Sequence, residues 1–470
     1  MHELLGQTLI ELTTTLRARK ASPVELMQAV LARIDATNKD LNAVVVMRDR
    51  DALLRDAKAA EERVARGEAR PLEGIPLGVK DLEDAAGLVT SMGSLPYRDN
   101  LAKHDSTQVA RLKAAGAIVV GKTNAPEFGY TAITKNLVYG VTRSPWNLER
   151  TPGGSSGGSA AAMAANVLPL VTSSDGGGSI RIPASFTGCF GLKTSFGRIP
   201  MGPFPEWRYQ DTSVFGPTTK TVEDGALFMD QVVGASACDP NSLPHPGISY
   251  LDTVRQPLPK KLRIAYSPDL SYAVVQSDVA AAVEANVKVF EQLGHRVEQI
   301  KGGPPQLGRE WGLLGTFEAA SHLHHLLPEQ EDKFGRTFLA GVKMGWQMTP
   351  EVWGKAAQLR MQLNNWCAKI FDHFDLLVTP TVPYDAPPAA GPFPNETEGR
   401  KQILAGVAAF TIPFNLSWHP AATVRVGVSR TKLPMGMQIV GPRHRDDLVL
   451  QAARAFERER PWHPQWPTTW

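Results

Sequence analysis

Two Gly-rich blocks give this chain serines whose setting suits nucleophilic chemistry. They lie in the run from Thr151 to Ala184, TPGGSSGGSAAAMAANVLPLVTSSDGGGSIRIPA, which places serines at 155 and 179. A serine hydroxyl is a poor nucleophile until a neighbouring base takes its proton, so a catalytic serine also needs a proton relay. An isolated Gly/Ser block is typical of a flexible linker or a helix cap. Here the first block leads directly into an Ala-rich helix and then a strand, and this context favours a catalytic loop.

The glycines of the second block predict a loop that binds an oxyanion. Gly176, Gly177 and Gly178 precede Ser179, and none carries a side chain that would obstruct its amide. Glycine readily adopts the conformations in which successive N–H groups point the same way. Losing one such donor typically costs about 2.7 to 4 kcal/mol of transition-state stabilisation. We therefore expect the amides of residues 176 to 179 to matter as much as the proton relay.

Several separated blocks in this order resemble the amidase signature family. The signature itself is the 151–184 run, with GGSSGG around Ser155 and DGGGSIRIP around Ser179. Similar blocks elsewhere are GIPLGVKD at 74–81, GKTNAPEFG at 121–129, GCFGLKTSFGRIP at 188–200 and LPMGMQIVGP at 433–442. The likeness covers most of the chain. It implies a single domain, residues 1–470, with an α/β fold whose central mixed β-sheet is covered by helices on both faces.

The resemblance implies an amidohydrolase that works through an acyl-enzyme. Ser179 is then the nucleophile, Ser155 the proton relay and Lys80 the base. Lysine in water has a pKa of about 10.4, but burial disfavours the charged form, and Lys80 ends the apolar strand GIPLGVK. The resemblance also implies a cis peptide bond before Ser155, and it implies no metal ion and no organic cofactor. Three further residues are expected to support the loop: Ser156, Asp175 and Arg181.

The sequence departs from the family pattern in ways that bear on the activity. Gly176 stands where a residue with a side chain is common, and Ser173 where glycine is common, which affects rate and substrate shape. The rival class is the glutamine-hydrolysing A subunit of a tRNA-dependent amidotransferase complex, which typically reads S-I-R-Q-P. Here Ile182 follows Arg181, and YQDTSVFGP at 209–217 replaces the usual block. These differences favour a free-standing amidase, and the presence of all three reacting residues disfavours a binding protein without activity.

The elements that must position these residues alternate along the chain. Ser22 can cap the helix SPVELMQAVLARID, with Glu25 completing a capping box, and DALLRDAKAAEERVARG ends at Gly67 as a left-handed cap predicts. DSTQVARLKAAG at 105–116 predicts a helix that leads into the strand AIVVGK. Further predicted strands are VLPLVTSS, KLRIAYS, HRVEQI, FDLLVTPT and MGMQIVG, and further helices are DVAAAVEANVKVFEQLG and DDLVLQAARAFERE. This alternation predicts a sheet with helices on both faces.

Two segments interrupt the alternation. Residues 304–353 are helical in pattern and rich in Trp, His and Met, and residues 384–399 are rich in Pro and Ala. We expect both to cover the pocket, although such insertions also sit at the rim of a sheet without touching substrate. Tryptophans 207, 311, 346 and 353 either line the pocket, which would favour aryl or bulky apolar groups, or belong to the core. The expected partner is a small-molecule amide or carbamate, with esters also open.

Composition excludes several other classes. The net charge of +3 is spread along 470 residues without a basic patch interleaved with aromatics, so we expect no nucleic acid partner. The three cysteines are far apart, which suits reduced thiols and a cytoplasmic location. The N-terminal residues mix Glu, Gln and Thr among apolar ones, so neither a signal peptide nor a membrane partner is expected. A homodimer is left open.

Two patterns that suggest other ligands do not hold up in context. GAIVVGKT at 116–123 has the spacing of a phosphate-binding loop, but its middle residues are themselves the strand. His322, His324 and His325 lie close together, yet no Cys, Asp or Glu stands at ligand spacing among them, and a helix would turn position 324 away from the other two. We therefore expect neither a nucleotide site nor a metal site.

Overall fold

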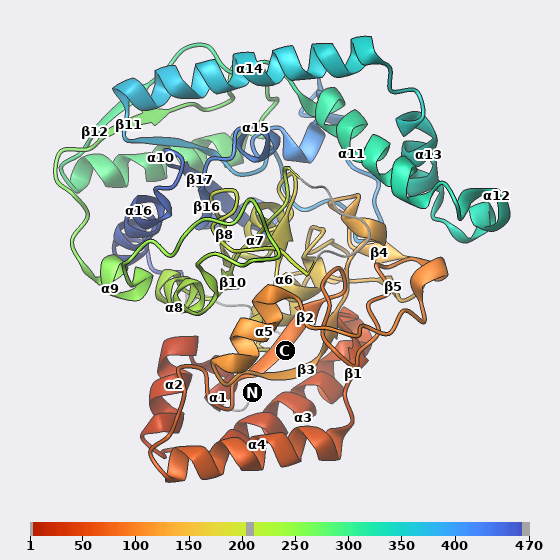
Figure 1. Cartoon of the computed structure of the whole chain (residues 1–470). Coiled ribbons are helices and arrows are strands. Elements are labelled where there is room, and N and C mark those ends of the chain that lie inside the picture. Colours follow the sequence, from red (N-terminus) through yellow and green to blue (C-terminus); the bar gives the residue numbers. More distant parts are fainter. Residues whose placement is uncertain (1–2, 204–210, 463–470) are drawn as a thin grey trace.

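The computed structural model describes residues 3–203 and 211–462. Its main strands form two hydrogen-bonded sheets (Figure 1). The order of the smaller sheet is β1 (Val44–Met47), β3 (Ile118–Thr123), β2 (Pro76–Lys80) and β6 (Leu170–Val171). The order of the larger sheet is β10 (Thr218–Thr219), β8 (Phe190–Lys193), β16 (Ala421–Val428), β17 (Pro434–Val440), β13 (Leu376–Pro380), β11 (Arg263–Tyr266) and β12 (Arg296–Gln299).

The central sheet is mixed, as the sequence predicted. In the smaller part, β2 runs parallel to β3 and β6, whereas β1 is antiparallel to β3. In the larger part, β11 is parallel to β12 and β13, and the remaining pairs are antiparallel. The two parts meet where β6 lies against β10. The central sheet is therefore divided into two sections rather than hydrogen-bonded throughout.

Helices cover both faces of the larger section. Successive strand residues point to opposite faces of a sheet, so neighbouring residues of β11 reach different helices. Ile264 of β11 belongs to the same apolar cluster as residues of α10 (Ser277–Gln292) and α16 (Asp446–Glu459), for example Val283 and Val449. The next residue, Ala265, packs in a different cluster with Ile370 of α14 (Pro350–His373) and Phe414 of α15 (Ile412–Leu416). Figure 1 shows α14 running across the top of the molecule, far from α3 and α4.

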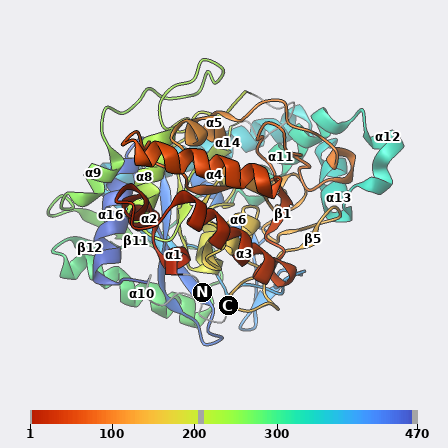
Figure 2. The ribbon, with the colours of Figure 1, turned by 90° about the horizontal axis from the view of Figure 1, so that it is seen from below.

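The N-terminal helices cover the smaller section. α1 (Glu3–Gly6) and α2 (Leu9–Arg17) precede α3 (Pro23–Leu41) and α4 (Arg50–Ala65). Ser22 accepts the Glu25 amide and Glu25 binds back to the Ser22 amide, so the predicted capping box is present. α3 and α4 pack on each other, and they pack on β2 and β3 respectively. Figure 2 shows α3 and α4 side by side in the view from below. Their apolar sides thereby bury the strand that carries Lys80.

The site is built by the elements in the middle of the chain. α5 (Thr107–Ala114) is capped by Ser106 and leads into β3, as predicted. α6 (Gly157–Ala164) and α7 (Arg181–Thr187) begin just after the two serine blocks. The two-stranded sheets are β7 (Ser174–Asp175) with β9 (Val214–Phe215), β4 (Lys135–Asn136) with β5 (Gly140–Val141), and β14 (Glu396–Thr397) with β15 (Arg400–Lys401). The helices α8 (Val222–Val232) and α9 (Tyr250–Arg255) lie side by side at the left of Figure 1.

The two interrupting segments have different structures. Residues 304–353 form α11 (Gly308–Leu323), α12 (Leu327–Gln330) and α13 (Arg336–Gly345), and the segment ends inside α14. α11 and α13 pack against each other and share a separate apolar cluster with Phe128. Residues 384–399 hold no α-helix, and Tyr384 and Ala386 pack near α7. Within the described parts of the chain, no helix has the length and apolar character needed to cross a bilayer.

Candidate active site

Lys80 is the last residue of β2, and its amine lies at the centre of a serine cluster. Nζ is 2.8 Å from Oγ of Ser155, 2.8 Å from Oγ of Ser156 and 2.9 Å from Oγ of Ser174. The Lys80 backbone N–H donates to Oγ1 of Thr172, which fixes the end of the strand. Because β2 lies between β3 and β6, the side chain is buried and only 1% exposed.

Burial changes the protonation of this lysine. It lowers the pKa of Lys80 to about 7, although the negative charges of Asp175 and Glu83 act in the opposite direction. A substantial fraction of the Lys80 side chains is then neutral near neutral pH. A neutral amine has a lone pair, so Lys80 has the electronic state that a base needs near neutral pH.

Ser155 and Ser156 lie at the turn that leads into α6. The peptide bond between Gly154 and Ser155 is cis. A Cβ at Gly158 would clash with the backbone of Asn124, so the glycines of the first block let α6 pack closely on the chain after β3. The Ser156 N–H donates to the carbonyl of Ser179 at 3.2 Å, which joins the two serine blocks directly.

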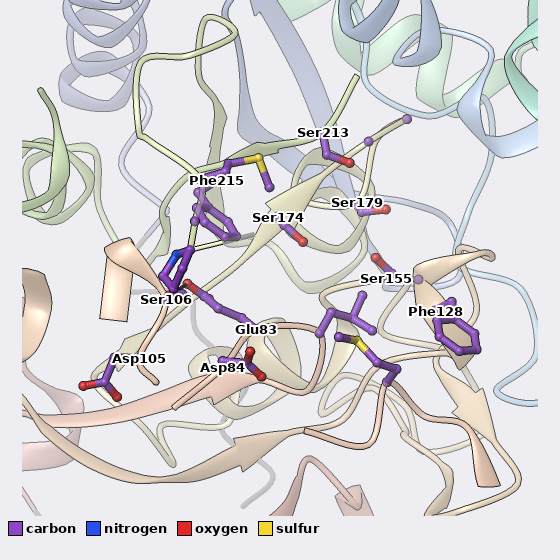
Figure 3. Close-up of a pocket in the computed structure, with 18 of the residues that line it drawn as sticks. Glu83, Asp84, Asp105, Ser106, Phe128, Ser155, Ser174, Ser179, Ser213 and Phe215 are labelled. Atoms are coloured by element: carbon purple, nitrogen blue, oxygen red, sulfur yellow. Dashed lines mark hydrogen bonds between the residues drawn. The ribbon is translucent and has the colours of Figure 1, made fainter. Parts of the chain in front are cut away.

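Ser179 lies between β7 and α7 and lines the same pocket as Ser155 and Ser174 (Figure 3). Figure 3 shows Ser155 and Ser179 near each other on one side of the pocket, with Asp105 on the far side. The structure thus brings together Lys80, Ser155 and Ser179, which come from segments up to 99 residues apart in sequence. The arrangement suits proton transfer from a serine hydroxyl to a buried amine.

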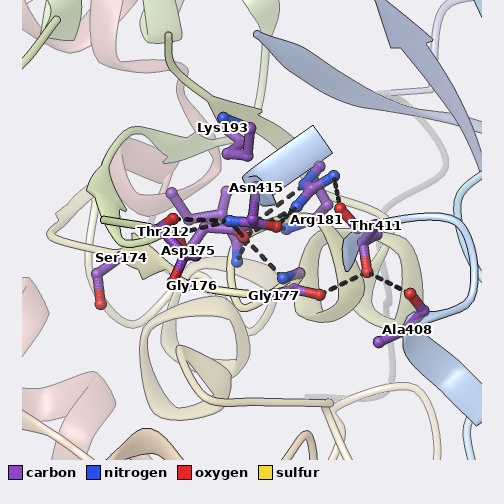
Figure 4. Close-up of polar contacts among 12 residues, drawn as sticks. Ser174, Asp175, Gly176, Gly177, Arg181, Lys193, Thr212, Ala408, Thr411 and Asn415 are labelled. Atoms are coloured by element: carbon purple, nitrogen blue, oxygen red, sulfur yellow. Dashed lines mark hydrogen bonds and ion pairs between the residues drawn. The ribbon is translucent and has the colours of Figure 1, made fainter. Parts of the chain in front are cut away.

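Asp175 and Arg181 hold the loop around Ser179 (Figure 4). Both side chains are fully buried and pair at 2.9 Å. Burial by itself would raise the pKa of Asp175, but the charge and hydrogen bonds of Arg181 outweigh it, and the pKa lies well below its usual range. The Arg181 guanidinium also donates to the carbonyl of Thr411 and to the side chains of Gln438 and Asn415. All five of its N–H groups are used, so its contacts are those of a structural residue.

The loop amides are not equivalent. The Gly178 N–H donates to Oδ1 of Asp175 at 2.7 Å, and the Ile180 N–H donates to Oδ2. Gly178, one of the four expected oxyanion donors, thus has its hydrogen engaged by a carboxylate in this conformation. The N–H groups of Gly176, Gly177 and Ser179 have no acceptor in the described part of the chain. They remain the candidate oxyanion donors.

The pocket has an apolar wall and a set of carboxyl groups. Its apolar lining residues are Leu82, Met92, Phe128, Met201, Phe215 and Trp311, and its carboxyl residues are Glu83, Asp84 and Asp105. Apart from Trp311, none of these residues could be recognised from the sequence, because only the fold brings them together. Ser174 was also missed, although it lies next to Asp175 in the signature.

Of the four tryptophans that the sequence left open between pocket and core, Trp311 lines the pocket. Trp346 and Trp353 are instead 55% and 52% exposed, and neither lines this pocket. Trp207 lies outside the described residues. Segment 304–353 therefore contributes one wall residue, whereas no residue of 384–399 lines this pocket.

The segment with phosphate-loop spacing and the three neighbouring histidines are both part of ordinary secondary structure or its ends. Val119 and Val120, inside the segment with phosphate-loop spacing, belong to β3. His322 and Leu323 end α11, and Nδ1 of His324 lies 2.7 Å from the carbonyl oxygen of Ser321, to which a ring N–H can donate. Among the residues that the structure describes, no three His, Cys, Asp or Glu side chains are grouped as metal ligands would be.

Comparison with known proteins agrees with this fold. A sequence model of the Amidase family matches residues 25–450. An acylamidase of Rhodococcus erythropolis is 35% identical, over 97% of this chain and 96% of the relative. The A subunit of the glutamyl-tRNA(Gln) amidotransferase of Geotalea daltonii is 32% identical, over 98% and 99%. The structure of a bacterial aryl acylamidase superposes with a TM-score of 0.92 at 27% identity, covering 99% of both chains.

The chain belongs to the amidase signature family. It is an amidase, a hydrolase of carbon–nitrogen bonds, with the α/β fold of that family.

Proposed function

We propose that this amidase cleaves small amides with Ser179 as nucleophile, Ser155 as proton relay and Lys80 as base. The observation that carries the proposal is the 2.8 Å contact between Nζ of Lys80 and Oγ of Ser155, made by a lysine that is 1% exposed. The Ser179 hydroxyl attacks the amide carbon while its proton passes to Ser155, whose own proton passes to the neutral lysine. Ser174 and Ser156 keep the amine in place.

The remaining steps use the same groups. The amide oxygen becomes an oxyanion, which the N–H groups of Gly176, Gly177 and Ser179 stabilise. Lys80 then returns its proton through Ser155 to the leaving nitrogen, the C–N bond breaks, and an amine departs from an acyl ester on Ser179. Water attacks this ester, loses its proton along the same path, and the acid is released with Ser179 restored.

The pocket wall supports amides with an apolar acyl or aryl group. Phe128, Phe215 and Trp311 give the pocket large aromatic surfaces, and apolar groups bind such surfaces by leaving water. Two of the similar proteins are named acylamidase and aryl acylamidase, which agrees with this choice. Aryl carbamates and esters present the same carbonyl to Ser179 and belong to the same substrate class.

A panel of four substrates tests the proposal. We expect kcat/KM to be highest for an acyl anilide such as p-nitroacetanilide, lower for a linear amide such as hexanamide, and measurable for an aryl carbamate. L-glutamine should be the poorest. Release of the amine or of ammonia is followed for each substrate at one pH. Preference for glutamine over the anilide by tenfold or more would overturn the proposal.

The second candidate is a glutaminase within a tRNA-dependent complex, which the Geotalea relative favours. No lysine or arginine lines the described part of the pocket, whose acidic lining residues are Glu83, Asp84 and Asp105. The pocket therefore offers no positive charge to pair with the α-carboxylate that glutamine carries. Ile182, which differs from the residue usual in such glutaminases, packs with Phe186 and Tyr384 behind the loop. Ile182 does not line the pocket, so the difference at this position affects the packing behind the loop and not the contact with substrate.

We also propose a cytoplasmic location. It is supported by Cys189 and Cys367, which are free thiols buried in the fold. The homodimer remains a prediction that size measurement in solution would settle.

A further inference from the structure

Trp311 makes two contacts with the loop before Ser179. It lies in the first turn of α11, and its indole N–H donates to the carbonyl of Gly176 at 2.8 Å. Its six-membered ring lies against Gly177, where a Cβ would clash with Cζ2 of the indole. Gly177 is thus a glycine because the indole occupies the place of a side chain. The same ring lines the catalytic pocket.

The carbonyl groups along this loop are all held, but by different parts of the molecule. The Gly177 carbonyl accepts from Thr411 Oγ1 at 2.6 Å, and the Gly178 carbonyl accepts from the Ile182 N–H at 2.7 Å. Both donors belong to the buried structure around α7 and α15. The Gly176 carbonyl instead accepts from Trp311, which belongs to segment 304–353.

This hydrogen bond fixes the direction of one candidate oxyanion donor. The carbonyl of Gly176 and the N–H of Gly177 belong to one planar trans peptide unit, so they point in opposite directions. Holding the carbonyl against the indole therefore fixes where the Gly177 N–H points. A donor aimed in advance stabilises a developing negative charge without having to reorganise during the reaction.

We propose that Trp311 is a positioning residue that orients the Gly176–Gly177 peptide for oxyanion binding. The inference rests on the proposed function, since it assumes that Ser179 attacks and that the Gly177 amide receives the negative oxygen. It adds that a helix outside the signature, α11, controls the efficiency of the signature loop. The indole N–H, rather than the ring area, is the part that does so.

The test removes the N–H and keeps the ring. Trp311→Phe, and Trp311 replaced by the isosteric benzothienylalanine, both lack the donor, and the second keeps the bicyclic shape. We expect kcat for p-nitroacetanilide to fall about tenfold, less than the about 10²- to 10³-fold loss that follows removal of a donor itself. KM should stay within twofold for the benzothienylalanine variant, which keeps the ring surface that lines the pocket. Trp353→Phe, in an exposed tryptophan of the same segment, is the matched control and should leave both constants unchanged.

A second measurement separates positioning from substrate contact. An aryl trifluoromethyl ketone adds to the serine and forms an oxyanion, so its Ki should rise in parallel with the fall in kcat. The Kd of the unreactive aryl alcohol of the same shape should not change. A raised KM with unchanged kcat, or unchanged Ki for the ketone, would overturn the proposal. If Ser179→Ala were also active, the proposed function itself would fail, which is a different outcome.

Discussion

At the scale of single residues, the protonation of Lys80 decides when this site works. The amine must be neutral to take a proton, and burial lowers its pKa to about 7. The active form is the deprotonated one, so activity is low below this pKa and reaches a plateau above it. The neighbouring serine hydroxyls remain un-ionised in this range, so they cause no second change in activity with pH.

The pH profile of kcat/KM should therefore rise through about pH 7 and stay high to pH 9. Lys80→Met should remove the rising limb and lower the rate by orders of magnitude, because it keeps the volume and removes the base. Lys80→Arg should be no better, since a guanidinium stays charged in this range. Stopped-flow or steady-state assays across pH 5 to about 10 check this. An arginine variant with most of the activity would make Lys80 an electrostatic residue.

Ser179→Ala should abolish hydrolysis while leaving the fold intact, because it removes the oxygen that forms the covalent intermediate. A fluorophosphonate should form one adduct on the wild type, with loss of fluoride, and none on the variant. Mass mapping of the labelled peptide checks the position. Ser213→Ala is the matched control, since Ser213 lines the same pocket and takes no part in the reaction. Near-normal turnover by Ser179→Ala, or adduct at another serine, would contradict the assignment.

At the scale of elements, one buried ion pair ties β7 to α7 and α15. Asp175 belongs to β7, Arg181 begins α7, and Asn415 of α15 donates to Asp175 and accepts from Arg181. The chain therefore closes this site with residues more than 230 positions apart. Removing one charge would leave the other buried without its partner.

Asp175→Asn should destabilise the protein by about 3 to 5 kcal/mol, because it leaves the Arg181 charge buried without its counter-charge. It should also reduce activity, since Gly178 and Ile180 lose the carboxylate that binds their amides. Urea unfolding followed by circular dichroism measures the first effect. Glu61→Gln breaks the exposed Lys58–Glu61 pair and should cost less than about 1 kcal/mol. Equal losses for the two variants would contradict the role of burial.

Local signals predicted the elements where a cap or glycine marks the boundary. Ser22 and Ser106 cap α3 and α5, and β3 begins one residue from its predicted start. The strand predicted over VLPLVTSS is present only as β6, Leu170–Val171. Ser174 and Asp175 do not continue β6. They form the separate strand β7, which pairs with β9 about 40 residues later, and no local sequence pattern indicates such a partner.

The site was predictable to the extent that its residues lie in ordered sequence blocks. Lys80, Ser155 and Ser179 come together as the sequence analysis expected. Thr411 and Asn415 were not found, because their contacts with the loop depend on how α15 packs. The Gly178 amide was assigned to the oxyanion, since the sequence does not reveal that the neighbouring carboxylate binds it.

At the scale of the whole molecule, α11 and α13 form a unit with its own apolar cluster beside the pocket. Phe338 of α13 stacks on Phe128 with ring centroids 4.8 Å apart, and Phe128 lines the pocket. The cluster is distinct from the one that packs the central sheet. A unit with a small separate core opens at a lower free energy than the sheet, so its stability can change independently.

Phe338→Ala removes a buried ring and should cost about 3 to 5 kcal/mol, mostly within this unit. Amide hydrogen exchange should accelerate in residues 308–345 while β16 and β17 stay protected. Activity should fall as well, because α11 belongs to this unit and holds Trp311 against the loop before Ser179. Phe290→Ala is the matched control: Phe290 is also buried, but it packs α10 on the central sheet. That variant should lower the global unfolding midpoint and speed exchange throughout, with normal activity in the folded fraction. Uniform loss of protection in Phe338→Ala would mean that α11 and α13 unfold only with the whole chain, and the pocket wall would then be as stable as the sheet behind it.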